Sequence, residues 1–337
     1  MHILYIQMEL TYIIPEGPKG FLIQNKQFLN YLTKSINYNY SLKGDSVFPA
    51  PQPVSIEKKD FSKFKSYKYT VALKLDGTRF LMYFIKDKHN NNYCILINRA
   101  LQFFTIEMNA ENTIYNGTII DGELIKIDNQ WTFMVHDAVL ICGNKINKLT
   151  HTNRLNDTKM CLESFIANNP ANTVNICIKE FYPFEDFTNF IDNVYNKNID
   201  RSDGIIFMPD KLPVISGTQY SMLKWKPPTK HTFDFLVNEI DVGLEAKIFH
   251  MGKMNTFAKI HNNTEQGKVF ITKTKEFADY KNECIVECTF NKEQQNFEPI
   301  LIRTDKTHPN SLRTIERTLF NINENINIED FQNINNQ

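Results

Sequence analysis

The feature that most constrains the fold is a succession of short β-rich runs, separated from one another by Asn, Gly and Asp. The runs are rich in Ile, Val, Phe and Tyr, and they lie at 69–84, 93–98, 118–127, 131–141 and 203–208. Short runs of this composition between turn residues predict antiparallel sheet. Helical patterns are expected at 57–65, 155–168 and 185–195. The pattern therefore predicts an α+β protein built around antiparallel sheet.

A second feature divides the chain. The dipeptide Pro227-Pro228 interrupts any regular element and marks the expected domain boundary. Beyond it, 233–303 contains about five further short strands, which suits a small barrel of the oligonucleotide-binding (OB) type. Leu312, Ile315 and Leu319 then have helical spacing and predict a closing helix. A length of 337 residues fits two such domains.

The charge balance limits the classes of function. Lys plus Arg number 38 and Asp plus Glu number 38, so the formal net charge is zero. Proteins that coat nucleic acid by bulk charge usually have a basic excess, so that class is disfavoured, whereas a local basic pocket is compatible. The chain has no apolar run of about 18 residues and no signal-peptide pattern at its start. The lack of such an apolar run predicts a protein without a membrane anchor. Its six cysteines form no CxxC pair, which favours reduced thiols in an intracellular protein.

Three Asp-Gly dipeptides begin at Asp76, Asp121 and Asp203, and each one alone would be interpreted as a hairpin turn. The surroundings of the first suggest chemistry, because Lys74 stands in an apolar strand pattern five residues before Arg79. A lysine of this kind is often an edge residue with a solvated head. It can also be a nucleophile, if burial and neighbouring cations favour the neutral amine.

Further carboxylates and lysines complete a set suited to phosphoryl or nucleotidyl transfer. Asp121 and Glu123 share a face of their predicted strand, because side chains alternate with a period of two. Lys224 and Lys226 are predicted to share one strand face, with Trp225 on the other. Solvated edge lysines are the alternative, but two adjacent cations are better explained by an anion such as a nucleotide phosphate. No GxxxxGK[ST] loop is present, so a nucleotide would not be bound by that motif.

Taken in order, these segments resemble the covalent nucleotidyltransferase superfamily, which contains mRNA capping enzymes and ATP-dependent polynucleotide ligases. The matching segments are Lys74-x-Asp76-Gly77-x-Arg79, Asp121-Gly122-Glu123, WTFMVHDAV with Asp137, Asp203-Gly204, Lys224-Trp225-Lys226-Pro227 and Arg303-x-Asp305-Lys306. LKWKPP and RTDKTHPN resemble the capping forms of their motifs. PQPVSIEKKDF and RTLFNINENINIEDF are similar to segments of the small monofunctional capping enzymes of chlorella viruses, which implies a viral protein.

The resemblance implies a role for each matching residue. Lys74 is implied to be the nucleophile that forms a lysyl–GMP phosphoamide, and Arg79 and Glu123 to contact the ribose. Arg99 is implied to contact phosphate, Phe133 to stack on guanine and Lys179 to contact guanine O6. The remaining implied contacts are a metal site at Asp203 and Glu123, the α-phosphate at Lys224 and Lys226, and the β- and γ-phosphates at Arg303, Asp305 and Lys306.

The resemblance also implies the architecture. It predicts an antiparallel-sheet nucleotidyltransferase domain of the ligase type, with ATP-grasp-like character, over 1–228. A C-terminal helical segment, 312–337, is expected to pack back onto that domain. A mobile OB-fold β-barrel domain is expected over 229–311.

The implied activity is that of a GTP:mRNA guanylyltransferase. GTP is the substrate, Mg²⁺ or Mn²⁺ the cofactor, and the 5′-diphosphate end of RNA the acceptor. An ATP-dependent RNA or DNA ligase with the same lysine chemistry is the alternative, and a binding module without activity is a second one. A monomer is expected, with a separate RNA triphosphatase and a separate cap methyltransferase. The expected location is a virion or the host cytoplasm or nucleus for a viral protein, and the nucleus for a cellular one.

Overall fold

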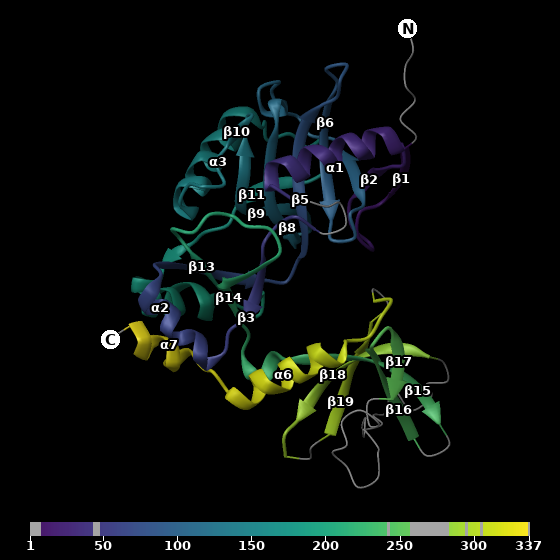
Figure 1. Ribbon diagram of the computed structural model, residues 1–337, viewed down its shortest axis with the longest axis vertical. Coiled ribbons are helices and arrows are strands. Elements are labelled where there is room, and N and C mark those ends of the chain that lie inside the picture. The colour runs from purple at the N-terminus through teal and green to yellow at the C-terminus, as the bar shows by residue number, and fades with distance from the viewer. Residues whose placement is uncertain are drawn as a thin grey trace. The chain divides into compact units, whose positions relative to one another are not determined.

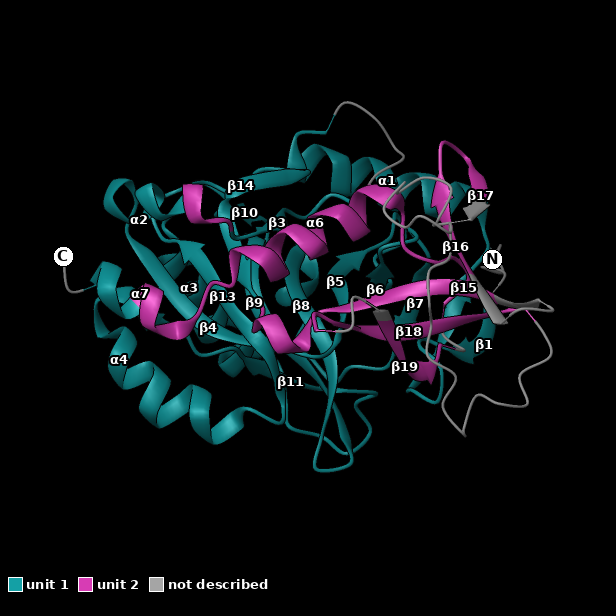
Figure 2. Cartoon of the chain, turned by 90° about the horizontal axis from the view of Figure 1, so that it is seen from below, with its two compact units in different colours: residues 1–56, 60–225, 332–337 teal, residues 57–59, 226–331 magenta. Residues whose placement is uncertain are grey.

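The structure is a computed structural model that describes residues 8–42, 48–240, 243–256, 283–293, 296–303 and 306–335. The chain forms two compact units, shown in different colours in Figure 2. The first comprises residues 1–56, 60–225 and 332–337, and the second comprises 57–59 and 226–331. The chain thus passes from the first unit to the second directly before Pro227-Pro228.

The larger sheet of the first unit has the strand order β1-β2-β7-β6-β5-β8-β9-β10, and β11 pairs with β9 (Figure 1). Its pairs are antiparallel except β9–β11, which is parallel. The strands are β1 (Met8–Tyr12), β2 (Lys19–Ile23), β5 (Thr78–Lys86), β6 (Asn92–Asn98), β7 (Phe103–Ile106), β8 (Thr118–Ile127), β9 (Gln130–Ile141), β10 (Asn144–Lys145) and β11 (Asn175–Ile178).

Both faces of this sheet are covered, which explains the nearly unbroken apolar run of β5. Phe80, Met82 and Phe84 point into a core that includes Cys161 and Leu162 of α3 (His151–Phe165). The intervening Leu81, Tyr83 and Ile85 point into a second core with Phe28, Leu32 and Ile36 of α1 (Lys26–Tyr40). Alternate side chains of a strand face opposite ways, so a strand between two helices is apolar at every position.

The smaller sheet of the first unit has the order β12-β4-β13-β14-β3. Its strands are β3 (Gln52–Ser55), β4 (Tyr69–Leu75), β12 (Tyr182–Pro183), β13 (Ser202–Pro209) and β14 (Thr218–Trp225). Only β3–β14 is parallel among these pairs. The first unit also contains η2 (Ile114–Asn116), α2 (Lys63–Ser66), η3 (Phe184–Asp186), α4 (Phe187–Phe190), a π-helical turn (Ile191–Tyr195) and η5 (Asn196–Asn198), whereas η1 (Lys58–Ser62) spans the limit between the units.

The second unit is an antiparallel sheet with the order β17-β16-β15-β18-β19. Its strands are β15 (Thr232–Ile240), β16 (Gly243–His250), β17 (Lys253–Thr256), β18 (Cys284–Asn291) and β19 (Asn296–Ile302), preceded by η6 (Pro228–Lys230). Within the described ranges no strand pairing joins the two edge strands, β17 and β19, so the expected OB barrel stays a prediction.

Helix Leu312–Glu324 lies in the second unit, whereas helix Ile328–Asn335 spans the limit between the two units. Ile315 and Ile322 of α6 (Leu312–Glu324) pack against Phe233 and other apolar residues of the second sheet. Residues 332–335 of α7 (Ile328–Asn335) cluster with the first unit. Of the segment 312–337 that was expected to pack onto the first domain, residues 312–331 thus cluster with the second unit.

The predicted α+β architecture with antiparallel sheets is confirmed, but the hairpin interpretation of the Asp-Gly dipeptides is wrong. Asp76-Gly77 joins β4 of one sheet to β5 of the other. Asp121-Gly122 lies inside β8, and Asp203-Gly204 lies inside β13. The residues around each dipeptide continue in paired strands, so tertiary pairing overrides the local turn preference. In the described part of the chain, no helix has the length and apolarity needed to cross a membrane.

Candidate active site

Lys74 and Asp203 form the ion pair on which the candidate site is built. Lys74 Nζ lies 2.6 Å from Asp203 Oδ2, and the exposed fractions of the two side chains are 23% and 24%. They come from the paired strands β4 and β13, whose register shifts between Ser202 and Ile205. A bulge of this kind turns a side chain away from its regular direction. Gly204, with φ of 137°, supplies the backbone conformation that the irregularity requires.

Arg79 is held by a buried carboxylate. Its Nε and Nη2 donate to the two oxygens of Asp121 at 2.9 and 2.5 Å, and its Nη1 donates to the carbonyl of Pro51 at 2.7 Å. The charge of Arg79, followed by that of His136, lowers the pKa of Asp121 well below its ordinary value, although burial alone would raise it. The planar guanidinium is thus fixed by three hydrogen bonds before any substrate binds.

Glu123 and Lys179 form a third ion pair in the same unit. Lys179 follows β11, and its Nζ lies 3.4 Å from Glu123 Oε2. Burial lowers the pKa of Lys179, the charge of Glu123 opposes that shift, and Lys74 and Arg79 add to it. Lys74 and Arg79 therefore lie close enough to Lys179 for their charges to disfavour its protonated form.

Arg99 lies in the turn after β6, where its Nη2 donates to Gln52 Oε1 at 3.1 Å. The side chain of Asn98 accepts hydrogen bonds from the backbone N–H groups of Ala100 and Gln102 and so orders this turn. Burial, and then the charge of Arg79, lowers the pKa of Arg99. Two arginines that repel each other are well suited to a shared anion.

Phe133 is placed differently from the expectation that it stacks on a base. Its ring is 0% exposed and belongs to the core between β5 and α3. A Cβ built on Gly122 would lie 2.7 Å from Phe133 Cζ, so the ring is pressed against the glycine backbone. A residue without an exposed face offers no surface to a base, and this placement does not support the stacking role.

His136 is the residue that the sequence analysis missed. Opposite β8, Asp121 pairs with Asp137 and Gly122 pairs with Val135, so His136 is the extra residue of a bulge in β9. Its side chain is 14% exposed, and its Nε2 lies 3.2 Å from Asp121 Oδ1. The sequence signal was the single polar aromatic residue in the apolar run of β9, but the bulge that directs it cannot be recognised from alternation alone.

Lys224 and Lys226 were predicted to share one face of one strand, and the structure places them differently. Lys224 lies in β14, directly opposite Ile206 of β13, and Trp225 beside it is buried. The strand ends at Trp225, and Lys226 belongs to the second unit. The two lysines therefore do not lie on one face of one strand, which corrects that expectation, because the pairing of β14 ends before Lys226.

The second unit holds the other expected phosphate contacts in an ionic cluster. Lys306 Nζ lies 2.9 Å from Asp234 Oδ2. Arg303 Nη1 lies 3.0 Å from Glu287 Oε2 and 3.5 Å from Asp234 Oδ1. Asp305 lies outside the described residues.

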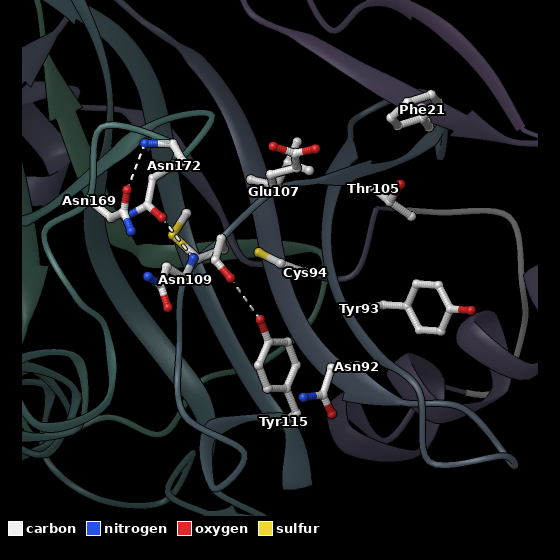
Figure 3. A pocket seen from close by; sticks show the side chains of 13 residues that line it. Phe21, Asn92, Tyr93, Cys94, Thr105, Glu107, Asn109, Tyr115, Asn169 and Asn172 are labelled. Carbon is white, nitrogen blue, oxygen red and sulfur yellow. Dashed lines mark hydrogen bonds between the residues drawn. The ribbon is translucent and has the colours of Figure 1, made fainter.

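The first unit also contains two cavities of about 560 Å³ each. One includes Lys179 in its wall, together with Leu75, Asp76, Met134 and Ile178. The other lies over β6 and β7 and is lined by polar residues that include Asn92, Thr105, Glu107, Asn109 and Asn172 (Figure 3). None of the predicted site residues lines the second cavity.

A partly exposed strand lysine paired with a carboxylate, with a buried lysine that interacts with it, is the arrangement expected of a lysine-dependent nucleotidyltransferase. The family model for the mRNA capping enzyme catalytic domain matches residues 17–228, and the model for the mRNA capping enzyme C-terminal domain matches residues 222–332. The chain therefore belongs to the mRNA capping enzyme family.

Curated relatives agree with this assignment. The chain is 26% identical over 326 residues to the mRNA-capping enzyme subunit alpha of Schizosaccharomyces pombe, covering 84% of this chain and 78% of that protein. It is 25% identical over 370 residues to the Saccharomyces cerevisiae protein of the same name, covering 87% and 80%. The mRNA-capping enzyme of Danio rerio is 27% identical over 295 residues, covering 80% of this chain and 46% of that protein.

Among solved structures, a mycobacterial DNA ligase D complexed with ATP and MES aligns with 77% of this chain at a TM-score of 0.43 and 12% identity. That similarity is too low to bear on the activity. The expected similarity to the small monofunctional capping enzymes of chlorella viruses stays a prediction.

Proposed function

We propose that the chain is a GTP:mRNA guanylyltransferase in which Lys74 carries the transferred GMP. The observation that carries this proposal is the placement of Lys74 Nζ, which is partly exposed on a strand and held 2.6 Å from Asp203, in a member of the capping enzyme family. A nucleophilic lysine must be accessible to its substrate. It also needs polar or charged neighbours that influence whether its amine is protonated.

The reaction proceeds in two displacements at one phosphorus. The neutral amine of Lys74 attacks the α-phosphorus of GTP, a P–N bond forms, and the bond to the β-phosphate oxygen breaks to release pyrophosphate. A terminal oxygen of the RNA 5′-diphosphate then attacks the same phosphorus, the P–N bond breaks, and GpppRNA leaves with Lys74 regenerated. Splitting the transfer in this way replaces one difficult displacement by two easier ones.

Four basic residues are proposed to bind the triphosphate. Arg79 and Arg99 share an electrostatic environment that favours an anion between them, and Lys224 and Lys226 would contact the α-phosphate. Donors that are already oriented stabilise developing charge without the cost of reorganising at the moment of reaction. The three hydrogen bonds that fix Arg79 supply this orientation.

Lys179 and His136 are proposed to recognise the base. A buried ammonium at Lys179 can donate to guanine O6, whereas the amino group of adenine offers no acceptor at that position. His136 takes the stacking role that was expected of Phe133, because its ring is partly exposed beside Asp121 whereas Phe133 is enclosed.

A divalent cation is proposed to bind at Asp203 and Glu123, whose carboxylates pair with Lys74 and Lys179 in the structure. Mg²⁺ is usually held by one or two carboxylates together with substrate phosphates and water, so each of the two could supply a ligand. Among the residues that the structure describes, no three His, Cys, Asp or Glu side chains form a group that could hold a metal ion by themselves. Such an ion would neutralise charge on the phosphates when it is bound.

The decisive experiment is covalent labelling. Incubation of the purified chain with α-labelled GTP and Mg²⁺ or Mn²⁺ is expected to give an adduct that survives denaturation and is released by acid, because a P–N bond is acid-labile. Lys74→Ala and Lys74→Arg are both expected to abolish it, since arginine cannot supply a neutral amine. Lys159→Ala on α3, whose lysine is 60% exposed and paired with Glu163, is the matched control and is expected to label normally.

Labelling by ATP in place of GTP would instead support the ligase alternative, which uses the same lysine chemistry. The RNA triphosphatase and the cap methyltransferase are proposed to be separate polypeptides. An intracellular location and a monomeric state are proposed with them, and the nucleus or the site of viral transcription is where nascent RNA ends would be available.

A further inference from the structure

The second unit places two carboxylates directly opposite each other. Asp234 on β15 pairs in register with Glu287 on β18. Like charges on directly opposed residues destabilise an antiparallel pair. Asp234 is also only 6% exposed, where an unpaired charge is costly. A cation is therefore required between these two strands.

Two cations meet that requirement, and both come from the segment after β19. Arg303 Nη1 reaches both carboxylates, at 3.0 Å from Glu287 and 3.5 Å from Asp234. Lys306 Nζ reaches Asp234 at 2.9 Å while its side chain remains 38% exposed. Asp234 thus joins two basic side chains that are three residues apart in sequence.

Asp234 itself is held rigidly. Asn310 donates from its side chain to Asp234 Oδ2 at 3.2 Å, accepts from the Asp234 backbone N–H at 3.0 Å, and donates from its own backbone to the Asp234 carbonyl at 2.8 Å. The other carboxylate oxygen, Oδ1, has no hydrogen-bond partner within the described residues and lies on the side of Arg303. The carboxylate therefore cannot rotate freely away from the cations.

We propose that Asp234 is a positioning residue which holds Arg303 and Lys306 together as one preorganised site for the pyrophosphate portion of the nucleotide. The proposal rests on the proposed function, because it concerns the group that leaves in the first displacement. Ordering two long basic side chains in advance lowers the entropy lost when they bind an anion. Once pyrophosphate has left, the site has no ligand, so Asp234 acts only in adduct formation and in its reversal by pyrophosphate.

The test compares three reactions of Asp234→Asn with those of the unaltered chain. The concentrations of GTP for half-maximal labelling and of pyrophosphate for half-maximal adduct reversal are expected to rise roughly tenfold to a hundredfold, the effect of losing one charge-assisted hydrogen bond. Adduct that has been loaded slowly at high GTP and freed of nucleotide is expected to transfer GMP to diphosphate-ended RNA within about twofold of the normal rate, because those cations are not used in that step.

Two further variants keep the test decisive if Asp234→Asn folds poorly. Glu287→Gln removes only the nearer of the two carboxylate partners of Arg303 and is expected to shift the same two constants in the same direction. Glu283→Gln, whose carboxylate pairs with Lys247 at 3.5 Å in the same unit, is the matched control and is expected to leave all three reactions unchanged.

Equal loss in labelling, reversal and RNA transfer would show that Asp234 and Glu287 only support the fold, and would overturn the proposal. Normal constants in both Asp234→Asn and Glu287→Gln would also overturn it. Failure of the unaltered chain to label with GTP would instead overturn the proposed function, so the two failures are distinguishable.

Discussion

The ring of Phe133 lies against the backbone of Gly122, so closely that a Cβ at position 122 would come within 2.7 Å of the ring and within 2.7 Å of the Met134 carbonyl oxygen. This contact brings β8 and β9 together at the point where β8 carries Asp121 and Glu123. The aromatic residue expected to bind the nucleotide thus supports the strand that carries the site.

Substitution Gly122→Ala is expected to reduce stability and activity together. The added methyl group meets a backbone oxygen that cannot move without its strand, so the free energy of unfolding is expected to fall by about 1–3 kcal/mol. Adduct formation is expected to fall as well, because Asp121 and Glu123 flank the glycine. Urea unfolding and GTP labelling measure the two effects. Lys126→Ala on the same strand is the control, and a Gly122→Ala protein as stable as that control would contradict the packing described here.

Base stacking is expected to depend on His136 and not on Phe133. His136→Ala is expected to weaken nucleotide binding by about 1–3 kcal/mol, the usual contribution of one stacked base. Phe133→Leu changes the shape of a buried side chain, so the free energy of unfolding is expected to fall by roughly 1 kcal/mol or slightly more. The GTP concentration for half-maximal labelling is expected to stay unchanged. Labelling titrations with both variants decide the matter, and the reverse pattern would restore Phe133 as the stacking residue.

Discrimination between GTP and ATP is expected to depend on the protonated amine of Lys179. Lys179→Met keeps the length of the side chain but removes the donor, so the preference for GTP is expected to fall by roughly tenfold to a hundredfold. Burial lowers the pKa of Lys179, so in the unaltered protein the ammonium is lost at a lower pH than for an exposed lysine. The GTP preference is therefore expected to decline as the pH rises into the alkaline range. A preference that is unchanged in Lys179→Met would show that another group reads O6.

The pairing of Asp121 with Arg79 predicts a specific pH dependence of stability. Because the pKa of Asp121 is lower in the folded protein than in the unfolded chain, its contribution is complete above the unfolded value of about 4 and is lost as the pH falls through the folded value. Asp121→Asn is expected to cost about 3–5 kcal/mol near neutral pH, since it leaves the buried Arg79 without its carboxylate. The difference from the unaltered protein is expected to shrink as the pH is lowered. Urea unfolding at several pH values measures it, with the exposed Asp192→Asn as a control whose difference stays small throughout.

The sequence predicted the candidate nucleophile and the order of the motifs, and it predicted the antiparallel α+β architecture that the structure confirms. It could do so because short apolar runs, a lysine within one of them and charged residues at fixed spacing are local properties. The boundary near Pro227-Pro228 follows from the same kind of local evidence, since proline disrupts regular structure wherever it stands.

The tertiary structure decided which side chains face one another. Whether Phe133 or His136 is accessible depends on a bulge that adds one residue to β9, and one residue is enough to reverse the face of a strand. Whether an Asp-Gly dipeptide is a hairpin turn, a link between sheets or part of a strand depends on the partner strand, which the dipeptide does not encode.

The ion pairs were also beyond the reach of sequence reasoning. Asp203 meets Lys74 across 129 positions of the chain, and Asp234 meets Lys306 across 72. Attraction between charges depends on distance in space and on burial, and neither can be read from spacing along the chain. The sequence by itself therefore determined which chemical groups the protein has, and the folded sheets decided which of them lie in contact with one another.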